Sequence, residues 1–432
     1  MNFFQLGILI FFGFFIIFGV LVFSGILPFF DTTPDGVGGE AVLWGAVPAE
    51  LLRAPLDELN SENKDVFSVR YEEKNEESFD TELVEALASG TGPDMILLPG
   101  NLLVRHENKL LPLPYAQMSA RTFRDTYAEG SELYLGSTGV LALPFSIDPM
   151  VMYWNRDLFT NAGIVGPPEE WDAFLSLAGT LTKKDAALNI SKSTIALGDF
   201  SNVRNAKDIL AMLIIQAGNP IVEVSEGVRR VSLYDQRGLV TPPAQSALRF
   251  YTEFANPSTP VYSWNRSLPN SRDMFAAGDL AVYFGRASER KAIAAQSPRL
   301  NFDVALVPQI QDVERKTTFA ALTGIAVLKN SRNPQTAFYA GYALTGKDFS
   351  ERFSRVSGVP PARRDLLSKP PKDADIFTPV FYNSALIARS WLDPRPDETE
   401  RIFSAMVSNV LSGRSTISSA VAKASEDLAA LF

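Results

Sequence analysis

The feature that most restricts the fold of this chain is an alternation of apolar runs with helix-like segments near the start of its globular body. The predicted strands are 41–44, 66–71 and 94–98, and the predicted helices between them are 48–60 and 79–89. A strand–helix order of this kind forms a parallel sheet with helices on its faces. Ligands of open parallel sheets bind beyond the carboxyl ends of the strands, which lie here beside Trp44 and Asn101.

Length and charge limit the classes of protein to which the chain can belong. A chain of 432 residues is long enough for two lobes, because single hydrophobic cores stop growing at about 250–300 residues. The formal net charge of −9, without any run of Lys or Arg, argues against nucleic acid as a partner. Because the chain has no cysteine, it has neither disulfides nor thiolate chemistry.

The N-terminal segment is the most apolar part of the chain. Residues 1–30 contain no charged side chain, and a helix over residues 3–27 would be about 37 Å long, against roughly 30 Å of hydrocarbon core. The sequence therefore predicts a transmembrane anchor or uncleaved signal at 1–30, followed by a Gly- and Asp-rich linker at 31–40. The acidic residues of the linker favour a single-pass anchor in the cell membrane with the globular body outside the cytoplasm. A long, cleaved signal peptide is the alternative.

The segment 139–163, GVLALPFSIDPMVMYWNRDLFTNAG, is the centre of the predicted fold. The apolar residues around Pro144 predict a short strand, which the proline ends because it has no N–H to donate. The aromatic and β-branched run 150–154 predicts a second strand, followed by a short helix capped by Asp157. The polar residues 146–148 then form a corner between the two strands.

This segment resembles the crossing between lobes in the family 1 extracellular solute-binding proteins of ABC importers, the sugar-binding type. The residues that carry the resemblance, in the family's order, are Pro144, Asp148, Tyr153, Asn155, Arg156, Asp157, Leu158, Phe159, Ala162 and Gly163. The stretches 86–94, ALASGTGPD, and 411–416, LSGRST, resemble two further steps of the family pattern. The family's Gly before the proline is replaced by Leu143.

The resemblance implies an α/β, two-lobed periplasmic-binding-protein-like fold with a hinge and a ligand cleft between the lobes. It implies an N-lobe of 41–145 plus 301–345 and a C-lobe of 146–300 plus 346–432. It further implies extracytoplasmic binding of a small solute, carbohydrate above all, for delivery to ABC permease subunits. We expect neither a cofactor nor a metal.

The candidate ligand-binding residues combine aromatic faces with polar groups, as a sugar cleft requires. They are Trp44, Asn101, Ser146, Asp148, Trp264, Arg286, Ser288 and Trp391. Trp264 and Trp391 lie in polar loops without apolar periodicity, where an aromatic side chain is poorly explained as core. Asp148 can accept two hydroxyl hydrogen bonds or bind a cationic group, although an Asp before a proline is also a common turn residue.

Three other functions remain open at this point, one of them a signalling or scaffold module whose cleft is empty. Arg286, in the predicted cleft loop 285–288, departs from the sugar-binding pattern and favours an anionic or peptide solute, unless it only pairs with Glu289. A membrane-tethered glycan-active enzyme would need a pair of carboxylates distant in sequence. A catalytic triad would need His106, the single histidine, which its polar surroundings at 104–108 place on the solvated surface.

Overall fold

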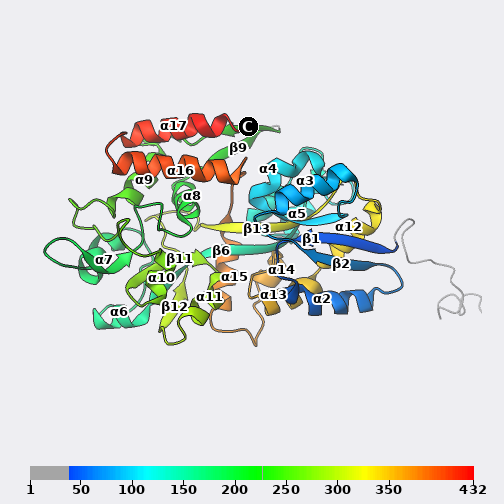
Figure 1. The fold of residues 1–432 in the computed structure, drawn as a ribbon, viewed down its shortest axis with the longest axis horizontal. Coiled ribbons are helices and arrows are strands. Elements are labelled where there is room, and N and C mark those ends of the chain that lie inside the picture. The colour runs from blue at the N-terminus through cyan, green and yellow to red at the C-terminus, as the bar shows by residue number, and fades with distance from the viewer. Residues whose placement is uncertain (1–37, 226) are drawn as a thin grey trace, which may run out of the picture.

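The computed structural model describes residues 38–225 and 227–432. Its main element is a ten-stranded mixed sheet, whose strands β6 and β13 cross the middle of the molecule (Figure 1). The strands of this sheet are β1 (Glu40–Gly45), β2 (Ser68–Glu73), β3 (Met95–Pro99), β6 (Leu143–Asn155), β7 (Lys183–Lys184), β8 (Ile190–Ile195), β11 (Leu280–Arg286), β12 (Phe302–Ala305), β13 (Thr318–Val327) and β14 (Ala388–Arg389). Two small antiparallel pairs lie outside it, β4 (Leu113–Pro114) with β5 (Gly139–Val140) and β9 (Val222–Ser225) with β10 (Val228–Val231).

The predicted parallel unit at the start of the body is confirmed. β1 pairs in parallel with both β2 and β3, and the connections contain α2 (Ala49–Glu62) and α3 (Phe79–Ser89). These two helices lie on opposite sides of the strands in Figure 1. The full strand order is β2-β1-β3-β13-β6-β11-β8-β7, with β12 on β6 and β14 on β13. Beyond β3 the pairs are antiparallel except β11 with β8 and β13 with β14, which are parallel.

β6 and β13 belong to both halves of the sheet. The first part of β6, up to Pro149, pairs with β13, whereas residues 150–154 pair with β11. β13 pairs with β3 through residues 323–327 and with β14 through residues 318–319. The two strands therefore join a first half, built on β1–β3, to a second half, built on β8 and β11.

The prediction of two strands separated by a polar corner is wrong. β6 is a single strand from 143 to 155 that includes Pro144 and Pro149. The sheet tolerates both prolines because this part of β6 has a regular strand partner on one side only, and its ladder shifts register beside Pro144. Helix α6 (Arg156–Asn161) follows directly, and its cap is Asn155, not Asp157: Asn155 Oδ1 accepts a hydrogen bond from the N–H of Leu158 at 3.0 Å.

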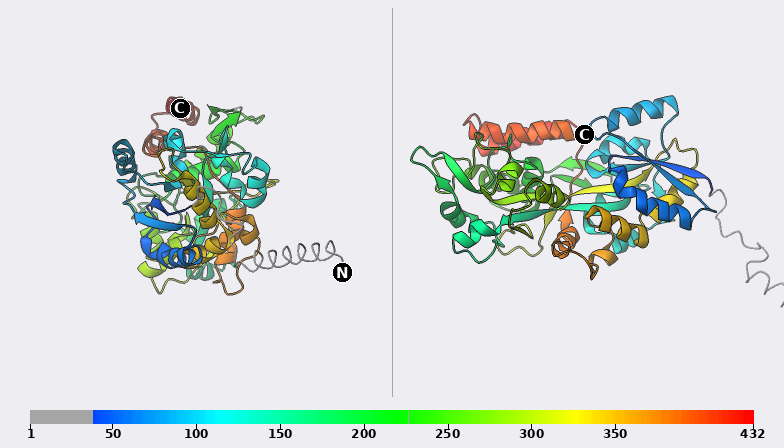
Figure 2. Two further views of the ribbon diagram at one scale, coloured as in Figure 1. Left: turned by 90° about the vertical axis from the view of Figure 1, so that its right-hand side faces the viewer. Right: turned by 60° about the horizontal axis from the view of Figure 1, so that its bottom comes forward.

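The remaining helices cover the two halves. They are α4 (Leu103–His106), α5 (Ala120–Thr126), α7 (Ala173–Leu181), α8 (Ala206–Gln216), α9 (Pro243–Glu253), α10 (Ser271–Ala276), α11 (Glu289–Gln296), α12 (Pro334–Leu344), α13 (Lys347–Ser357), α14 (Arg364–Leu367), α15 (Thr378–Leu386), α16 (Pro396–Leu411) and α17 (Ile417–Ala429). Figure 2 shows α16 and α17 side by side, and both pack on α9 of the second half. α13 packs against α2 of the first half, although the sequence assigns residues 346–432 to the C-lobe. The exact lobe boundaries stay a prediction.

Apolar side chains form two core clusters. The larger one is continuous across both halves of the sheet. The smaller one lies in the first half and includes Leu52 of α2, Leu97 of β3 and Phe349 of α13. Because the large cluster is shared, the halves are packed against each other through the core as well as through β6 and β13.

The predicted transmembrane segment 1–30 and most of the linker 31–40 lie outside the described residues. The end of the linker is part of the fold instead, because the Gly38 N–H donates to Thr336 Oγ1 at 3.0 Å and Glu40 begins β1. Within residues 38–432, position 226 apart, no helix combines the length and the apolar character that crossing a membrane requires.

Candidate ligand-binding site

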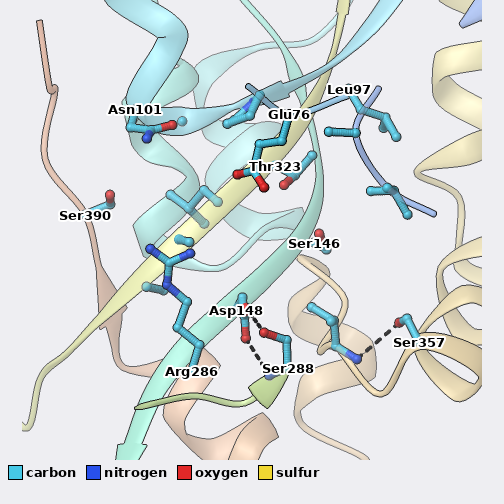
Figure 3. A pocket seen from close by; sticks show the side chains of 18 of the residues that line it. Glu76, Leu97, Asn101, Ser146, Asp148, Arg286, Ser288, Thr323, Ser357 and Ser390 are labelled. Carbon is cyan, nitrogen blue, oxygen red and sulfur yellow. Dashed lines mark hydrogen bonds between the residues drawn. The ribbon is translucent and has the colours of Figure 1, made fainter. Parts of the chain in front are cut away.

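A cavity of about 770 Å³ is lined by residues from both halves of the sheet. Its volume lies within the roughly 300–1,000 Å³ typical of sites for small molecules. Figure 3 shows side chains from β6, β11 and the loops after β1 and β3 converging on it. Among the lining side chains are Glu50, Glu76, Asn101, Ser146, Asp148, Lys207, Asp208, Arg286, Ser288, Lys291, Phe319, Thr323, Phe353, Ser390, Trp391 and Asp393.

One wall of the cavity follows the carboxyl ends of the parallel strands. Val47 and Glu50 lie just after β1, at the start of α2, and Asn101 lies just after β3. Strands end and their helices begin at this edge, so side chains of the connecting segments project beyond the sheet. An open parallel sheet presents its ligand site at this position.

The floor of the cavity is formed by the two shared strands. Ser146 and Asp148 of β6 and Thr323 of β13 face it. Asp148 accepts two hydrogen bonds from Ser288, from the backbone N–H at 3.0 Å and from Oγ at 2.6 Å. Burial raises the pKa of the Asp148 carboxyl, against the opposing effects of the Arg286 charge and of these hydrogen bonds. Asp148 therefore ties the shared strand to the loop after β11.

The opposite wall carries cations that already have carboxylate partners. Nη2 of Arg286, at the end of β11, lies 2.6 Å from Oδ2 of Asp208 on α8. Nζ of the neighbouring Lys207 lies 3.1 Å from Asp393 Oδ2 and 3.6 Å from Glu400 Oε2. Opposite charges at such short distances cancel much of each other's field at the cavity.

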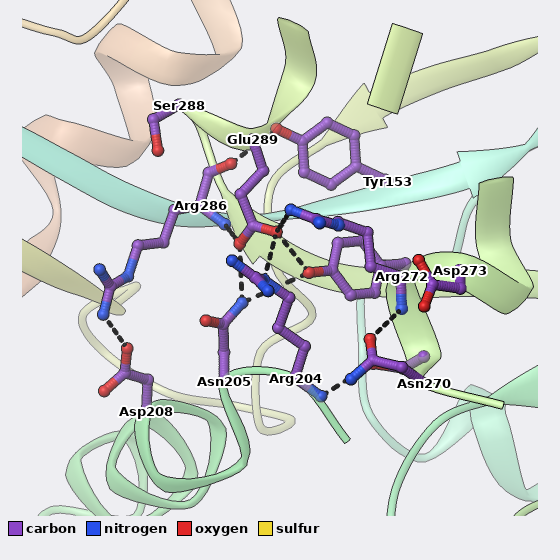
Figure 4. Close-up of polar contacts among 12 residues, drawn as sticks. Tyr153, Arg204, Asn205, Asp208, Asn270, Arg272, Asp273, Arg286, Ser288 and Glu289 are labelled. Atoms are coloured by element: carbon purple, nitrogen blue, oxygen red, sulfur yellow. Dashed lines mark hydrogen bonds and ion pairs between the residues drawn. The ribbon is translucent and has the colours of Figure 1, made fainter. Parts of the chain in front are cut away.

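A buried carboxylate positions the loop that carries Arg286 (Figure 4). Glu289, the first residue of α11, is 8% exposed. Its Oε1 accepts hydrogen bonds from the N–H of Arg286 at 3.0 Å and from Asn205 Nδ2 at 2.8 Å. Its Oε2 accepts from the Tyr283 hydroxyl at 2.6 Å and from Arg204 Nε at 3.2 Å. These bonds fix the backbone between β11 and α11, and with it the origin of the Arg286 side chain.

Aromatic surface is supplied by Trp391, which follows β14. The Trp391 ring lines the cavity and stacks on Phe403 of α16, with ring centroids 6.1 Å apart. Phe319 and Phe353 line other parts of the cavity. The combination of aromatic faces with fixed polar groups is suited to a molecule that has both C–H and hydroxyl surfaces.

Comparison with known proteins identifies the family of the chain. The family model described as bacterial extracellular solute-binding protein matches residues 55–378, most of the chain. The chain belongs to this solute-binding protein family. A protein of Brucella abortus (strain 2308) named as a binding protein is 22% identical over 291 residues, which are 66% of each chain. The match thus spans just under two thirds of that relative's length.

Solved structures share the fold of this solute-binding protein. The sugar-binding protein MalE from Xanthomonas citri superposes with a TM-score of 0.73 at 16% identity, covering 91% of this chain and 97% of that one. A cyclic alpha-maltosyl-1,6-maltose binding protein from Arthrobacter globiformis gives 0.74 at 16% identity, with 91% and 98% covered. An ABC transporter solute-binding protein from Thermotoga lettingae, bound with alpha-D-tagatose, gives 0.65 at 20% identity, with 91% and 99% covered. The predicted two-lobed α/β fold is therefore confirmed.

The structure brings most of the predicted site residues of this solute-binding protein together. The cavity is lined by Asn101, Ser146, Asp148, Arg286, Ser288 and Trp391. The expectation that Arg286 could pair with Glu289 holds only for its backbone N–H, because its guanidinium pairs with Asp208. Asp148 lies within a strand rather than in a turn.

Two predicted tryptophans do not line the cavity, and their assignment to it is wrong. Trp264 is fully buried, and its Nε1 donates to Asn202 Oδ1 at 2.9 Å. Its side chain therefore anchors the surrounding polar loop in the core. Trp44 is 8% exposed and packs in the larger core cluster, with the Lys74 ammonium 3.7 Å from its ring centroid. Its strand does end at the ligand-facing edge, but the ring points into the core and leaves that edge to the residues after Gly45.

Several lining residues of this solute-binding protein were not among the predicted ones. Val47 and Glu50 can be predicted by the rule that was applied to Trp44, namely that ligands bind beyond the carboxyl ends of parallel strands. The rule only has to be extended a few residues further along the chain. Lys207 and Asp208 lie on α8, whose mostly apolar sequence suggests only a buried helix. Ser390 precedes Trp391 in the same loop, so the aromatic signal could have included it.

The prediction for His106 is also wrong. Its side chain is fully buried; Nε2 lies 3.0 Å from Asp80 Oδ1, and Nδ1 lies 3.1 Å from Lys109 Nζ. Burial, together with the charge of Lys109, lowers the pKa of His106 to about 4. His106 is not among the residues that line the cavity. In the described part of the chain, no group of His, Asp and Glu side chains is arranged to hold a metal ion.

Proposed function

We propose that this protein captures a carbohydrate outside the cytoplasm and delivers it to an ABC importer. The observation that carries the proposal is the cavity itself, whose floor is made of strands shared by both halves and whose walls come from each half. Two structural neighbours support carbohydrate as the class of ligand: one is named as a cyclic alpha-maltosyl-1,6-maltose binding protein, and the other is bound with alpha-D-tagatose.

In the proposed complex, Trp391 stacks on a sugar ring while polar groups of the floor bind its hydroxyls. Ser146 and Asn101 can each donate and accept a hydrogen bond, and Asp148 has acceptor capacity beyond its two bonds from Ser288. A micromolar Kd corresponds to about −8 kcal/mol, which a stacked ring and a few hydrogen bonds in a preformed cavity can supply.

The proposed role is binding without catalysis. The family is one of binding proteins. Among the lining carboxylates, Asp208 and Asp393 are engaged with cations and Asp148 with Ser288, whereas Glu50 and Glu76 have no ion-pair partner among the described residues. These internal bonds favour a structural role for the three carboxylates over that of an acid and base pair.

The remaining parts of the proposal concern location and partners. The uncharged, apolar segment 1–30 would hold the body at the outer face of the cell membrane as a single-pass anchor. Closure of the two halves about β6 and β13 would present a joint surface to the permease subunits.

Isothermal titration of the purified full chain with a panel of neutral mono- and oligosaccharides tests the function. We expect at least one saccharide to bind, and Trp391→Ala to weaken its binding about tenfold. Trp154→Phe is the matched control, because Trp154 lies on β6 outside the cavity lining and packs on Phe159. Absence of binding across the panel, or equal affinity of the Trp391→Ala variant, would contradict the proposal.

A further inference from the structure

The charges that face the cavity carry information about its ligand. The cationic side chains that line it are Lys207, Arg286 and Lys291, and the anionic ones are Glu50, Glu76, Asp148, Asp208 and Asp393. Which of these charges a ligand can use depends on the partners that each already has inside the protein.

The guanidinium of Arg286 is closely compensated. Asp208 Oδ2 lies 2.6 Å from Nη2; the Asp208 side chain is 11% exposed and the Arg286 side chain 37% exposed, so water screens the pair only in part. Asp148 and Glu289 also act on the same charge from β6 and α11. Figure 4 shows Arg286 directed toward Asp208 on α8, on the side away from the Glu289 cluster. Asp208 engages Nη2 alone, but a ligand carboxylate that approached the guanidinium would lie near Asp208 and meet its negative charge.

Lys207 is compensated even more fully. Its side chain is only 12% exposed, and Nζ has carboxylates of Asp393 and Glu400 within 3.6 Å. Nζ also donates to Thr399 Oγ1 at 3.2 Å and to the Pro396 carbonyl at 3.2 Å. The ammonium therefore has no direction left from which a ligand anion could approach it without displacing a protein group.

The other charges of the lining also oppose an anion. Within the described residues, Glu50 and Glu76 have no cation at ion-pair distance, and both side chains are exposed at the cavity. Lys291 is the exception among the cations, because its Nζ donates to the neutral Val356 carbonyl at 2.8 Å. Its side chain is exposed, where water and salt weaken its attraction for a ligand.

We infer that the cavity selects uncharged saccharides over acidic ones, and that Asp208 sets this preference by occupying Arg286. The inference rests on the proposed function and narrows its ligand class to neutral, polyhydroxylated molecules. The presence of Arg286 in the sequence suggests an anionic solute, and its pairing with Asp208 removes the basis for that suggestion.

The test compares matched neutral and acidic sugars by isothermal titration of the full chain. The probes are glucose with glucuronate and maltose with its C6-oxidised uronic acid; in each acid a carboxylate replaces a hydroxymethyl group and the pyranose rings stay closed. We expect the wild-type protein to bind each acid at least about tenfold more weakly than its neutral counterpart. We expect Asp208→Asn to bind the acids about tenfold to a hundredfold more tightly than wild type, as one charged hydrogen bond allows.

Two variants separate the role of Arg286 from general effects of charge removal. Asp279→Asn also frees a cation, because Asp279 forms a 2.8 Å ion pair with Lys192. Both residues lie outside the cavity lining, so this variant should leave the affinity for acids unchanged. Adding Arg286→Gln to Asp208→Asn should return the affinity for acids to the wild-type value.

Equal or tighter binding of the acids by the wild-type protein would overturn the inference, and this comparison needs no variant to fold. A folded Asp208→Asn protein without gain in affinity for acids would also overturn it. If no neutral sugar binds to any form, the proposed function fails, whereas gain of glucuronate binding by Asp208→Asn alone would still support the role of Asp208.

Discussion

Lowering the pH from 7 toward 4 should destabilise the folded protein through His106, the only histidine in the chain. Nδ1 of the ring accepts from the Lys109 ammonium at 3.1 Å, so a proton on Nδ1 requires that hydrogen bond to break. Nε2 then carries the hydrogen of the neutral ring; it lies 3.0 Å from Asp80 Oδ1, but the two atoms do not form a hydrogen bond. Arg105 contacts the same Asp80 carboxylate, and its positive charge weakens the stabilisation that this carboxylate would give to a protonated imidazole.

The size and sign of the effect follow from the two pKa values. In the unfolded chain the imidazole takes up a proton near pH 6.5, and in the folded protein only near pH 4. Between pH 4 and pH 6.5 the unfolded state binds more protons than the folded state, so protonation favours unfolding. The contribution of neutral, buried His106 to the free energy of unfolding is therefore complete above pH 6.5 and is lost as the pH falls to 4. A difference of this size is worth about 3 kcal/mol as an upper value.

The assay uses the uniqueness of His106. Its ring C–H resonances can be followed by NMR without assignment of other histidines, and we expect a midpoint near pH 4. Urea unfolding at several pH values should show stability falling across the window, and the slope should flatten in His106→Gln. Because burial raises the pKa of Asp148 and Asp393, these groups act in the opposite direction, and subtracting the variant's curve isolates the histidine. A ring midpoint near 6.5 would refute the reasoning.

Three further substitutions test the packing described above, each by urea unfolding. Glu289→Gln should cost about 3 kcal/mol, because it removes a buried charge that accepts four hydrogen bonds, whereas Glu351→Gln on the surface should change stability by less than about 0.5 kcal/mol. Gly324→Ala should cost about 1–3 kcal/mol, because its Cβ would lie 3.0 Å from Tyr134 Cζ in the core; no loss would mean that β13 can shift there. Gly179→Ala should instead stabilise α7 by up to about 1 kcal/mol, because a Cβ there meets no atom within 4 Å. A loss of stability would contradict the reasoning that alanine stabilises a helix wherever its methyl group has open space.

Local patterns in the sequence predict the elements of the first half well. The bounds of α3 agree with the predicted 79–89, because its apolar spacing is regular and Gly90, with a φ of 71°, ends it in the left-handed conformation. The edge of the sheet that forms the cavity wall also follows from the order of strands and helices, which needs no knowledge of distant contacts.

The parts that sequence patterns miss depend on partners far away in the chain. Pro144 and Pro149 read as strand breakers, but β13 supplies a ladder that accommodates them. Trp264 reads as a loop aromatic, but Asn202 receives its indole N–H inside the core. The pairing of Arg286 with Asp208 joins residues from β11 and α8, so no spacing along the chain reveals that the charge is already compensated.

The position of β13 in the sheet has a consequence for biosynthesis. β3 is made early, but its antiparallel neighbour β13 (Thr318–Val327) leaves the ribosome only after the strands β6, β8 and β11 have been translated. Until then the nascent chain carries an apolar strand with one open edge, the kind of template on which chains associate wrongly. The growing polypeptide therefore has to be kept from its neighbours until β13 has been made, and chaperone capture should be strongest on fragments that stop before residue 318.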